Sequence, residues 1–314
     1  MHDATLSYEQ YALSTLGTKW FLDFSTNMSA IPAGRSKMVP FLDLPGPSAS
    51  TIQVTAQQAP GAVWYVLGEP NRRGISAADA VTPLHDIYVA IRAADPTARI
   101  TSPSVLNWDF TCVGCGGYTP GRTWITAFLS QYRSQYNSDP PWDIWAIDAY
   151  PLDYENLPTV NAQIPIAQIT GMWAFMDGQA AHRGKPIWVT EISLHWGWER
   201  LYLVPANPPA VPEPYALPCG NYRTDRVIDY LKESFDWLEA NASSKNIQRW
   251  FMFLTYSNLA QPTADSAYAG ASLFNSPGVG ASLSSVGQFF RDRAQGIHKQ
   301  TSEYNLAGAS ITCP

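Results

Sequence analysis

Two glutamates stand where two apolar segments of the sequence end. Glu69 ends the segment Val63–Glu69, and Glu191 ends the segment Ile187–Glu191. Both segments are rich in β-branched and aromatic residues, a pattern typical of parallel strands that are covered on both faces. A carboxylate at the C-terminal end of a barrel strand lies on the face where barrel enzymes carry out chemistry. Two such carboxylates, brought together by barrel closure, form the pair that hydrolysis of a glycosidic bond requires.

The two glutamates are expected to differ in role. Glu69 is the candidate general acid/base, because Trp64 and Tyr65 supply apolar surroundings of the kind that raise a carboxyl pKa. Glu191 is the candidate nucleophile, which stays ionised and attacks the anomeric carbon. The structural alternatives are a loop cap before Pro70 for Glu69 and an ion pair with Arg or Lys for Glu191. Since a carboxylate rarely follows so apolar a run without a partner, the catalytic roles are favoured.

Other polar and aromatic side chains follow the expected strand ends. Tyr150 is expected to donate a hydrogen bond to Glu191 and to orient it. Asp148 shares its strand face and could bind a sugar hydroxyl, position the acid/base or be structural. A Trp on the loop after Glu191 could be a sugar platform or a lid over the core. The further sugar-binding candidates are Asn71, Asn107, Trp108, Trp196, Trp198 and Tyr256.

Strands and helices alternate along the chain, and they must position these side chains. The segment 98–106 is expected to form one strand, and Ser76 is expected to cap a helix. An eighth strand is expected to be short, irregular, or located near Ile52–Thr55. Strand–helix alternation predicts parallel strands with right-handed crossovers. We therefore expect a single (β/α)8 TIM barrel over residues 1–314, with one short or irregular unit in its N-terminal half. Strands are predicted at 19–25, 38–44, 63–69, 98–106, 143–150, 187–191 and 249–256, and helices at 77–93, 122–135, 165–182, 224–240 and 285–295.

The composition argues against several other classes of protein. A net charge of −6 is unfavourable for nucleic-acid binding, and no stretch approaches the ~18 apolar residues of a membrane span. Neither a dinucleotide-binding Gly-x-Gly-x-x-Gly after the first strand nor the Gly-x-Ser-x-Gly of serine hydrolases is present. Some of the 12 Trp could stack on sugar rings, although more than half are expected to fill the core. We expect a monomer without a cofactor, acting on a polysaccharide or oligosaccharide.

The four cysteines bear on the compartment. Cys112 and Cys115 form one Cys-x-x-Cys, while Cys219 and Cys313 stand alone. A zinc site normally has a second close pair, so disulfides are favoured over a metal. Residues 1–4 do not read as a signal peptide and resemble the start of a mature domain. These features predict a secreted, disulfide-bonded protein without a bound metal.

The segments around both glutamates resemble those of the clan A glycoside hydrolases, retaining enzymes on (β/α)8 barrels. In that clan the acid/base ends strand four in an Asn-Glu-Pro signature and the nucleophile ends strand seven, and Glu69 and Glu191 match these positions. The order of segments is most similar to glycoside hydrolase family 128 and related glycosyl hydrolase catalytic core sequences. The segments that carry this resemblance are Leu67–Asn71, Ser102–Pro103, residues 143–150 and Lys185–Glu191.

The chain departs from the clan's pattern at two positions. Gly68 replaces the Asn that normally binds the sugar 2-hydroxyl, a contact that strengthens in the transition state. Asn71 or Asn107 could supply the contact, the 2-position could be treated differently, or activity could be weakened. Asp148 stands where the family has a His. The resemblance implies an endo-acting retaining hydrolase of a polysaccharide such as a β-glucan. The alternatives are a non-catalytic carbohydrate-binding barrel and, with little beyond the fold in its favour, an α/β scaffold.

Overall fold

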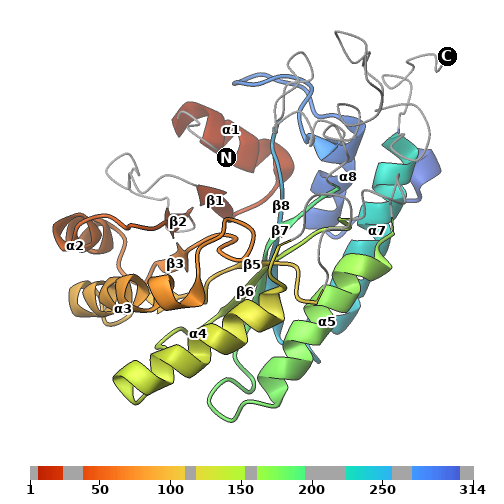
Figure 1. Cartoon of the computed structure of the whole chain (residues 1–314). Coiled ribbons are helices and arrows are strands. Elements are labelled where there is room, and N and C mark those ends of the chain that lie inside the picture. Colours follow the sequence, from red (N-terminus) through yellow and green to blue (C-terminus); the bar gives the residue numbers. More distant parts are fainter. Residues whose placement is uncertain are drawn as a thin grey trace, which may run out of the picture.

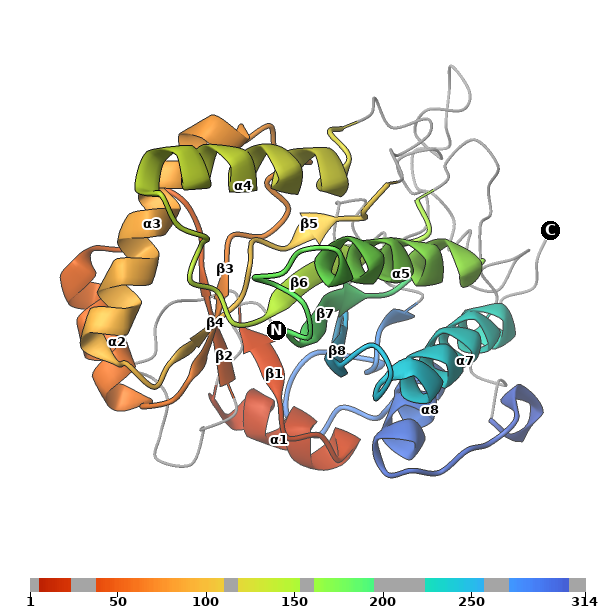
Figure 2. The ribbon, with the colours of Figure 1, turned by 90° about the horizontal axis from the view of Figure 1, so that it is seen from below.

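Parallel strands form the centre of the molecule, and helices surround them (Figures 1 and 2). The computed structural model describes residues 6–23, 38–109, 118–152, 161–194, 224–256 and 271–304. In chain order its elements are α1 (Leu6–Leu16), β1 (Phe21–Asp23), β2 (Met38–Leu42), α2 (Ala49–Gln58), β3 (Val63–Val66), α3 (Ala77–Ala94), β4 (Arg99–Ile100), β5 (Val105–Leu106), α4 (Gly121–Tyr136), β6 (Trp145–Ala149), α5 (Gln163–Asp177), β7 (Ile187–Ile192), α7 (Thr224–Asn241), β8 (Ile247–Met252), α8 (Ser285–Ala294) and the 3-10 turn η4 (Thr301–Glu303).

The strands pair in sequence order, β1-β2-β3-β4 and β5-β6-β7-β8, and every pairing is parallel. The expected strand at 98–106 is therefore two short strands. Between them, Thr101 bridges to Ile144 and Ser104 to Gly68, which keeps the segment between β3 and β6. Pro103 explains the interruption, because proline has no N–H for a ladder hydrogen bond. This segment is the irregular unit expected in the N-terminal half.

The prediction of a strand near Ile52–Thr55 is wrong, because these residues lie in α2. Ile52, Thr55 and Ala56 are its buried residues, and this spacing defines one helix face. Ser48 caps the helix by accepting a hydrogen bond from the Thr51 N–H at 3.2 Å. The β-branched residues favoured a strand, but strand propensity depends strongly on context. Within the described residues the barrel thus has seven strand positions, and a cavity of about 420 Å³ lies between β1 and β8.

The predicted helices are present with small changes at their ends. Ser76 caps α3 as expected, since its hydroxyl accepts from the Asp79 N–H at 3.1 Å. Helix α5 ends at Asp177, five residues before the predicted His182. Helix α1 was not expected from the sequence. In the described part of the chain, no helix combines the length and apolarity needed to cross a bilayer.

The core has two layers, and strand alternation decides which layer each side chain joins. Trp64 and Val66 of β3 pack outward into the cluster beneath the helices. Tyr65 points the other way, into a smaller interior cluster. Of the two aromatic residues beside Glu69, Tyr65 is therefore the one that lies inside the barrel. That interior cluster consists of Leu22, Val39, Val63, Tyr65, Ile144 and Trp188.

Candidate active site

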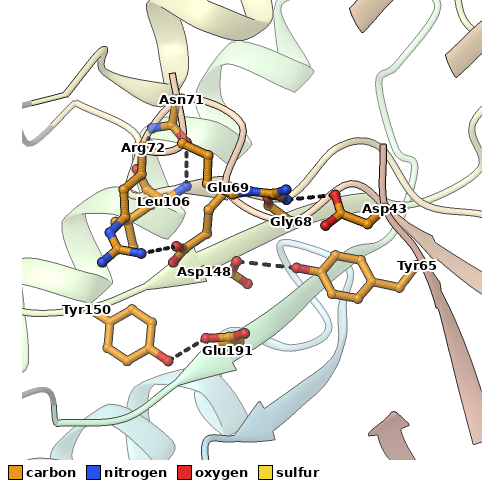
Figure 3. Close-up of polar contacts among 11 residues, drawn as sticks. Asp43, Tyr65, Gly68, Glu69, Asn71, Arg72, Leu106, Asp148, Tyr150 and Glu191 are labelled. Carbon is orange, nitrogen blue, oxygen red and sulfur yellow. Dashed lines mark hydrogen bonds and ion pairs between the residues drawn. The ribbon is translucent and has the colours of Figure 1, made fainter. Parts of the chain in front are cut away.

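Glu69 follows β3 on a turn with unusual backbone geometry. Leu67 has φ 59° and Glu69 has φ 48°. These are left-handed backbone values that residues other than Gly and Asn rarely adopt. The turn is held from both sides: the Leu67 N–H donates to Leu42 O at 2.7 Å, and the Glu69 N–H donates to Ser104 O at 2.7 Å. Such strain persists only where neighbouring structure enforces it, and it concentrates at functional sites. Here it directs the Glu69 side chain toward β6 and β7 (Figure 3).

Glu191 lies inside β7 and pairs in parallel register with Asp148 of β6. The hydrogen bond expected from the sequence is present: Tyr150 Oη donates to Glu191 Oε2 at 2.6 Å. Tyr150 is buried, so this O–H is shielded from water. Its donation favours the ionised form of the carboxyl and fixes one of its two oxygens.

Glu69, Asp148 and Glu191 form a compact group of three carboxyls. One oxygen from each lies within 4.8 Å of one oxygen from each of the others. Figure 3 shows the three side chains converging from the ends of β3, β6 and β7. Asp148 is fully buried, Glu191 is 9% exposed, and the Glu69 side chain is 20% exposed. The two sequence-predicted catalytic glutamates are thus brought together, with the aspartate as a third member.

Asp148 is enclosed by hydroxyl groups. Its Oδ1 accepts from Thr190 Oγ1 at 2.7 Å and from Ser104 Oγ at 2.9 Å, while Oδ2 accepts from Tyr65 Oη at 3.3 Å. Burial, and then the charge of Glu69, raise the pKa of Asp148 to about 8, against the lowering effect of these hydroxyls. Asp148 therefore holds a proton through most of the neutral range.

The pKa values of both glutamates are also raised, with burial as the largest cause. For Glu69 the positive charges of Arg72 and Arg73 oppose the rise. For Glu191 the negative charges of Asp148 and Glu69 add to a large rise, and the hydrogen bond from Tyr150 opposes it. Three carboxyls this close cannot all be ionised at neutral pH, so they share protons.

Arg72 forms an ion pair with Glu69, with 3.3 Å between Arg72 Nη1 and Glu69 Oε2. Arg72 is 56% exposed, and solvent-exposed pairs of this kind contribute little to stability. Arg73 instead pairs with Asp43 at 2.7 Å and donates to Gly68 O at 3.0 Å, which supports the turn. The ion-pair partner of Glu69, Arg72, is therefore exposed to solvent, whereas the hydrogen-bond partner of Glu191, Tyr150, is buried.

The two asparagines proposed for sugar binding are engaged with the backbone. Asn71 donates through Nδ2 to Leu106 O and Thr119 O, each at 2.9 Å, which uses both of its amide protons. Asn107 donates to Tyr150 O and accepts from the Tyr150 N–H, each at 2.9 Å. These contacts tie the strand ends together and hold Tyr150 in place. They do not support a direct sugar contact for Asn71.

The expected aromatic platforms have different positions. Trp108 does not face a cleft: it is fully buried, with its ring 5.2 Å from Phe175 and 6.4 Å from Trp145 between centroids. Tyr256, after β8, is partly buried and lies near Tyr8 of α1, whose pKa is raised chiefly by burial and slightly by Tyr256. Trp196 and Trp198 lie outside the described residues, as do the four cysteines, Cys112, Cys115, Cys219 and Cys313.

Sequence reasoning missed the polar floor of the site, formed by Tyr65, Ser104 and Thr190. Thr190 precedes Glu191 and Ser104 follows Pro103, so both stand next to segments that the sequence singled out. Tyr65 was considered only as an apolar wall, although its hydroxyl reaches Asp148. The alternation of Trp64 and Tyr65 was the available signal, since one of them had to point into the barrel.

Among the residues that the structure describes, two groups of side chains have the spacing of metal ligands. The three carboxyls are one, but their oxygens accept several O–H donors, which favours shared protons over a cation. The other group is Asp236, Glu239 and His298. Arg293 forms ion pairs with Asp236 at 2.7 Å and with Glu239 at 2.6 Å, so this group is part of an ion-pair network.

Comparison with known proteins places this geometry in a family. A search of curated proteins gave no match. Among solved structures, the chain is similar to a family 128 (subgroup IV) endo-β-1,3-glucanase from Lentinula edodes, with 15% identity, a TM-score of 0.55, and coverage of 86% of this chain and 88% of that one. It is also similar to a family 128 (subgroup VI) exo-β-1,3-glucanase from Aureobasidium namibiae, with 15% identity, a TM-score of 0.56, and coverage of 95% and 93%.

A third similar structure is a monomeric β-xylosidase from Caulobacter crescentus, with 13% identity, a TM-score of 0.51, and coverage of 90% of this chain and 63% of that one. At these identities the similarity shows the fold alone, a (β/α)8 barrel, of which the described residues supply the seven strand positions counted above. The family model described as glycosyl hydrolase catalytic core matches residues 7–290. The chain therefore belongs to the glycosyl hydrolase catalytic core family.

Proposed function

We propose that the protein is a retaining glycoside hydrolase that cleaves β-glycosidic bonds by double displacement. The observation that carries this proposal is the approach of Glu69 and Glu191, whose closest carboxyl oxygens lie within 4.8 Å. Retaining pairs are about 5–5.5 Å apart, whereas inverting pairs are about 6.5–9.5 Å apart to leave room for a water. The 4.8 Å bound applies to the closest oxygens, and we infer that the carboxyl groups themselves have the retaining separation, which allows direct attack by a carboxylate on the sugar.

Glu191 is the proposed nucleophile. The Tyr150 O–H at 2.6 Å stabilises its anion and orients it, leaving the other oxygen to attack the anomeric carbon. As the new carbon–oxygen bond forms, the bond to the leaving-group oxygen breaks. Because Asp148 holds a proton at neutral pH, it is uncharged and does not repel the Glu191 anion.

Glu69 is the proposed general acid/base. Burial raises the pKa of Glu69, and with Tyr150 donating to Glu191 to hold it as the anion, the shared proton on Glu69 is available for the departing oxygen. In the second step the ionised Glu69 takes a proton from water, and the resulting attack at the anomeric carbon releases Glu191. The exposed Arg72 can move away from Glu69 as a substrate enters, because their ion pair is weakly held.

The proposed substrate is a β-1,3-glucan, and the proposed mode of action is endo. Both family 128 neighbours are named as β-1,3-glucanases, one of them endo-acting and the other exo-acting. We further propose that the protein is secreted, where it would meet a polysaccharide substrate, and that it is a monomer, as the β-xylosidase neighbour is named. The non-catalytic carbohydrate-binding barrel is the competing function, and the presence of both glutamates argues against it.

A panel of β-1,3-glucan, mixed-linkage β-glucan, mannan, xylan and galactan tests the proposal. We expect hydrolysis of β-1,3-glucan, a rapid fall in polymer length, and the β-anomer as the first product seen by NMR. An α-anomer as first product would show inversion, and release of only short sugars from chain ends would show exo action. Retention of a glycan on affinity gels without any hydrolysis would favour the binding protein.

A further inference from the structure

The space beside Gly68 is filled by the hydroxyl group of Tyr65. A Cβ atom placed on Gly68 would lie 2.9 Å from Tyr65 Oη and 3.5 Å from Phe41 Cε2. The first distance is closer than real Cβ contacts, and the second is an ordinary van der Waals contact. With Tyr65 in place, residue 68 cannot carry a side chain unless the phenol shifts. The Tyr65 hydroxyl thus occupies the position into which a side chain at 68 would project.

The Tyr65 side chain is held rigidly, and its hydroxyl lies beside Asp148 and Ser104. The residue is 1% exposed, and its ring lies 5.0 Å from the ring of Phe41, tilted by 47°. Its contact with Asp148 Oδ2 is 3.3 Å, longer than the 2.5–3.0 Å usual for an O–H···O hydrogen bond. Because the bond to Asp148 is long, the phenol proton can turn from Asp148 to a nearer acceptor.

The surroundings of Tyr65 keep its hydroxyl protonated. Burial raises the pKa of the phenol well above its usual value, and the charges of Asp148, Glu191 and Glu69 raise it further. Figure 3 shows the hydroxyl on the Asp148 side of the three carboxyls, joined to Asp148. Tyr65 is consequently a neutral hydrogen-bond donor beside Asp148 and within electrostatic reach of both proposed catalytic groups.

We propose that Tyr65 is a substrate-binding residue whose hydroxyl, seated against Gly68, donates a hydrogen bond to the 2-hydroxyl of the sugar held between Glu69 and Glu191. This inference rests on the proposed function. A sugar whose anomeric carbon meets both carboxyls places its 2-hydroxyl on the adjacent carbon, within the same enclosure. A hydrogen bond to that hydroxyl strengthens in the transition state of glycoside cleavage. Tyr65 then provides, from β3, the contact that Gly68 cannot make.

Tyr65→Phe combined with a 2-deoxy substrate tests the contact. The variant removes one buried donor and keeps the ring, and we expect kcat/KM to fall about 10²-fold on the ordinary glycoside. On the matched 2-deoxy glycoside, wild type and variant should have equal kcat/KM, because the partner of the hydroxyl is gone. A 6-deoxy glycoside should retain the full difference between the two proteins.

Tyr88→Phe is the matched control for the loss of a buried phenol hydroxyl. Tyr88 in α3 is fully buried, and its hydroxyl has no hydrogen-bond partner within the described residues. We expect this variant to keep wild-type kcat/KM on all three substrates. Thermal unfolding of each variant reports whether its fold is retained.

Gly68→Ala tests the packing independently. In the wild-type background the new Cβ meets Tyr65 Oη, so Gly68→Ala should lower kcat/KM. In the Tyr65→Phe background that oxygen is absent, so Gly68→Ala should cause no further loss of kcat/KM. The inference fails if the losses from Tyr65→Phe and from 2-deoxygenation multiply, if Tyr65→Phe leaves kcat/KM unchanged, or if Gly68→Ala costs the same in both backgrounds. Absence of wild-type activity on every glycoside would instead overturn the proposed function, and this inference with it.

Discussion

The two strand ends that carry the glutamates are built in different ways. Glu191 lies within the regular strand β7 and is oriented by one buried side chain, Tyr150, at 2.6 Å. Glu69 lies beyond the end of β3 with φ 48°, and backbone hydrogen bonds from neighbouring segments hold its turn. The direction of Glu191 thus depends on a side chain, whereas that of Glu69 depends on the backbone. A nucleophile needs a fixed oxygen, while an acid/base must deliver and recover a proton.

The electrostatic surroundings of the two glutamates also differ: Glu191 interacts with a buried group, and Glu69 with an exposed one. Asp148 pairs in register with Glu191 and is buried, so water and salt hardly screen the interaction between the two carboxyls. Arg72 is the main charged neighbour of Glu69 and is more than half exposed. The pKa of Glu191 should therefore respond strongly to buried substitutions, and the pKa of Glu69 should respond weakly to surface substitutions.

Replacing the glutamates themselves should have the largest effect on activity and should separate their roles. Glu191→Gln removes the nucleophile, so we expect kcat to fall by at least ~10⁴-fold on every substrate. Glu69→Gln removes only the proton donor. Formation of the glycosyl-enzyme from a dinitrophenyl glycoside should therefore be largely preserved, because this leaving group needs no proton. Steady-state and burst-phase kinetics on activated and natural substrates provide the comparison.

Added azide sharpens this first prediction. In Glu69→Gln, azide should restore turnover and give a β-glycosyl azide, because an anionic nucleophile needs no general base. In Glu191→Gln, azide should enter from the vacated face and give the α-azide. NMR of the products identifies the anomers. The opposite assignment of anomers would mean that the two roles are reversed.

Tyr150→Phe should have the next largest effect, because it removes the side chain that orients Glu191. A hydrogen bond to a charged group contributes about 1.5–3 kcal/mol, so kcat/KM should fall roughly 10–100-fold. The lost donor had lowered the pKa of Glu191, so the acidic limb of the pH profile should move to higher pH. The pH dependence of kcat/KM measures this shift, and an unchanged acidic limb would argue against the contact in solution.

Asp148→Asn should change how stability depends on pH. The folded-state pKa of Asp148 is about 8, well above the ~3.9 of an unfolded chain. The folded form therefore binds the extra proton between these values, and the free energy of unfolding falls as pH rises from about 4 to about 8. The variant should lose this slope, which is at most about 1.4 kcal/mol per pH unit. Urea unfolding at pH 5, 6, 7 and 8 provides the test, and parallel slopes would contradict it.

Arg72→Gln should have the smallest effect, because its ion pair with Glu69 is exposed to solvent. The positive charge lowers the pKa of Glu69, so its removal should move the alkaline limb of the pH profile slightly to higher pH. We expect kcat/KM at the optimum to change by less than about threefold. Salt screens such a pair, so variant and wild type should converge at ~1 M NaCl. A large shift that resists salt would show that Arg72 acts as a buried group.

The parts of the site that could be predicted from the sequence are those fixed by local pattern. An uncharged apolar run that ends in a carboxylate identifies β3 and β7 with their glutamates, and the period of two in a strand places Tyr150 and Asp148 on one face. The helix cap at Ser76 depends on four consecutive residues and was likewise recognisable. Each of these features requires knowledge of a single segment only.

The remaining features depend on which segments meet in space. Asn71 and Asn107 are polar residues after strand ends, but the carbonyl groups that occupy their amides belong to other segments. Trp108 follows a strand end yet packs into the core beside Trp145 and Phe175. Tyr65 was recognisable as interior or exterior only after the register of the barrel was known. Long-range contacts of this kind leave no local signal in the sequence.

Trapping the covalent intermediate tests the central claim most directly. A dinitrophenyl 2-deoxy-2-fluoro-β-glucoside, or its β-1,3-linked disaccharide form, reacts with a retaining enzyme and leaves a slowly hydrolysed glycosyl ester on the nucleophile. Mass spectrometry of the intact protein should show one added fluorosugar, and peptide sequencing should locate it on Glu191. Absence of any adduct in a protein that hydrolyses the parent glycoside, or an adduct on Glu69, would contradict the account.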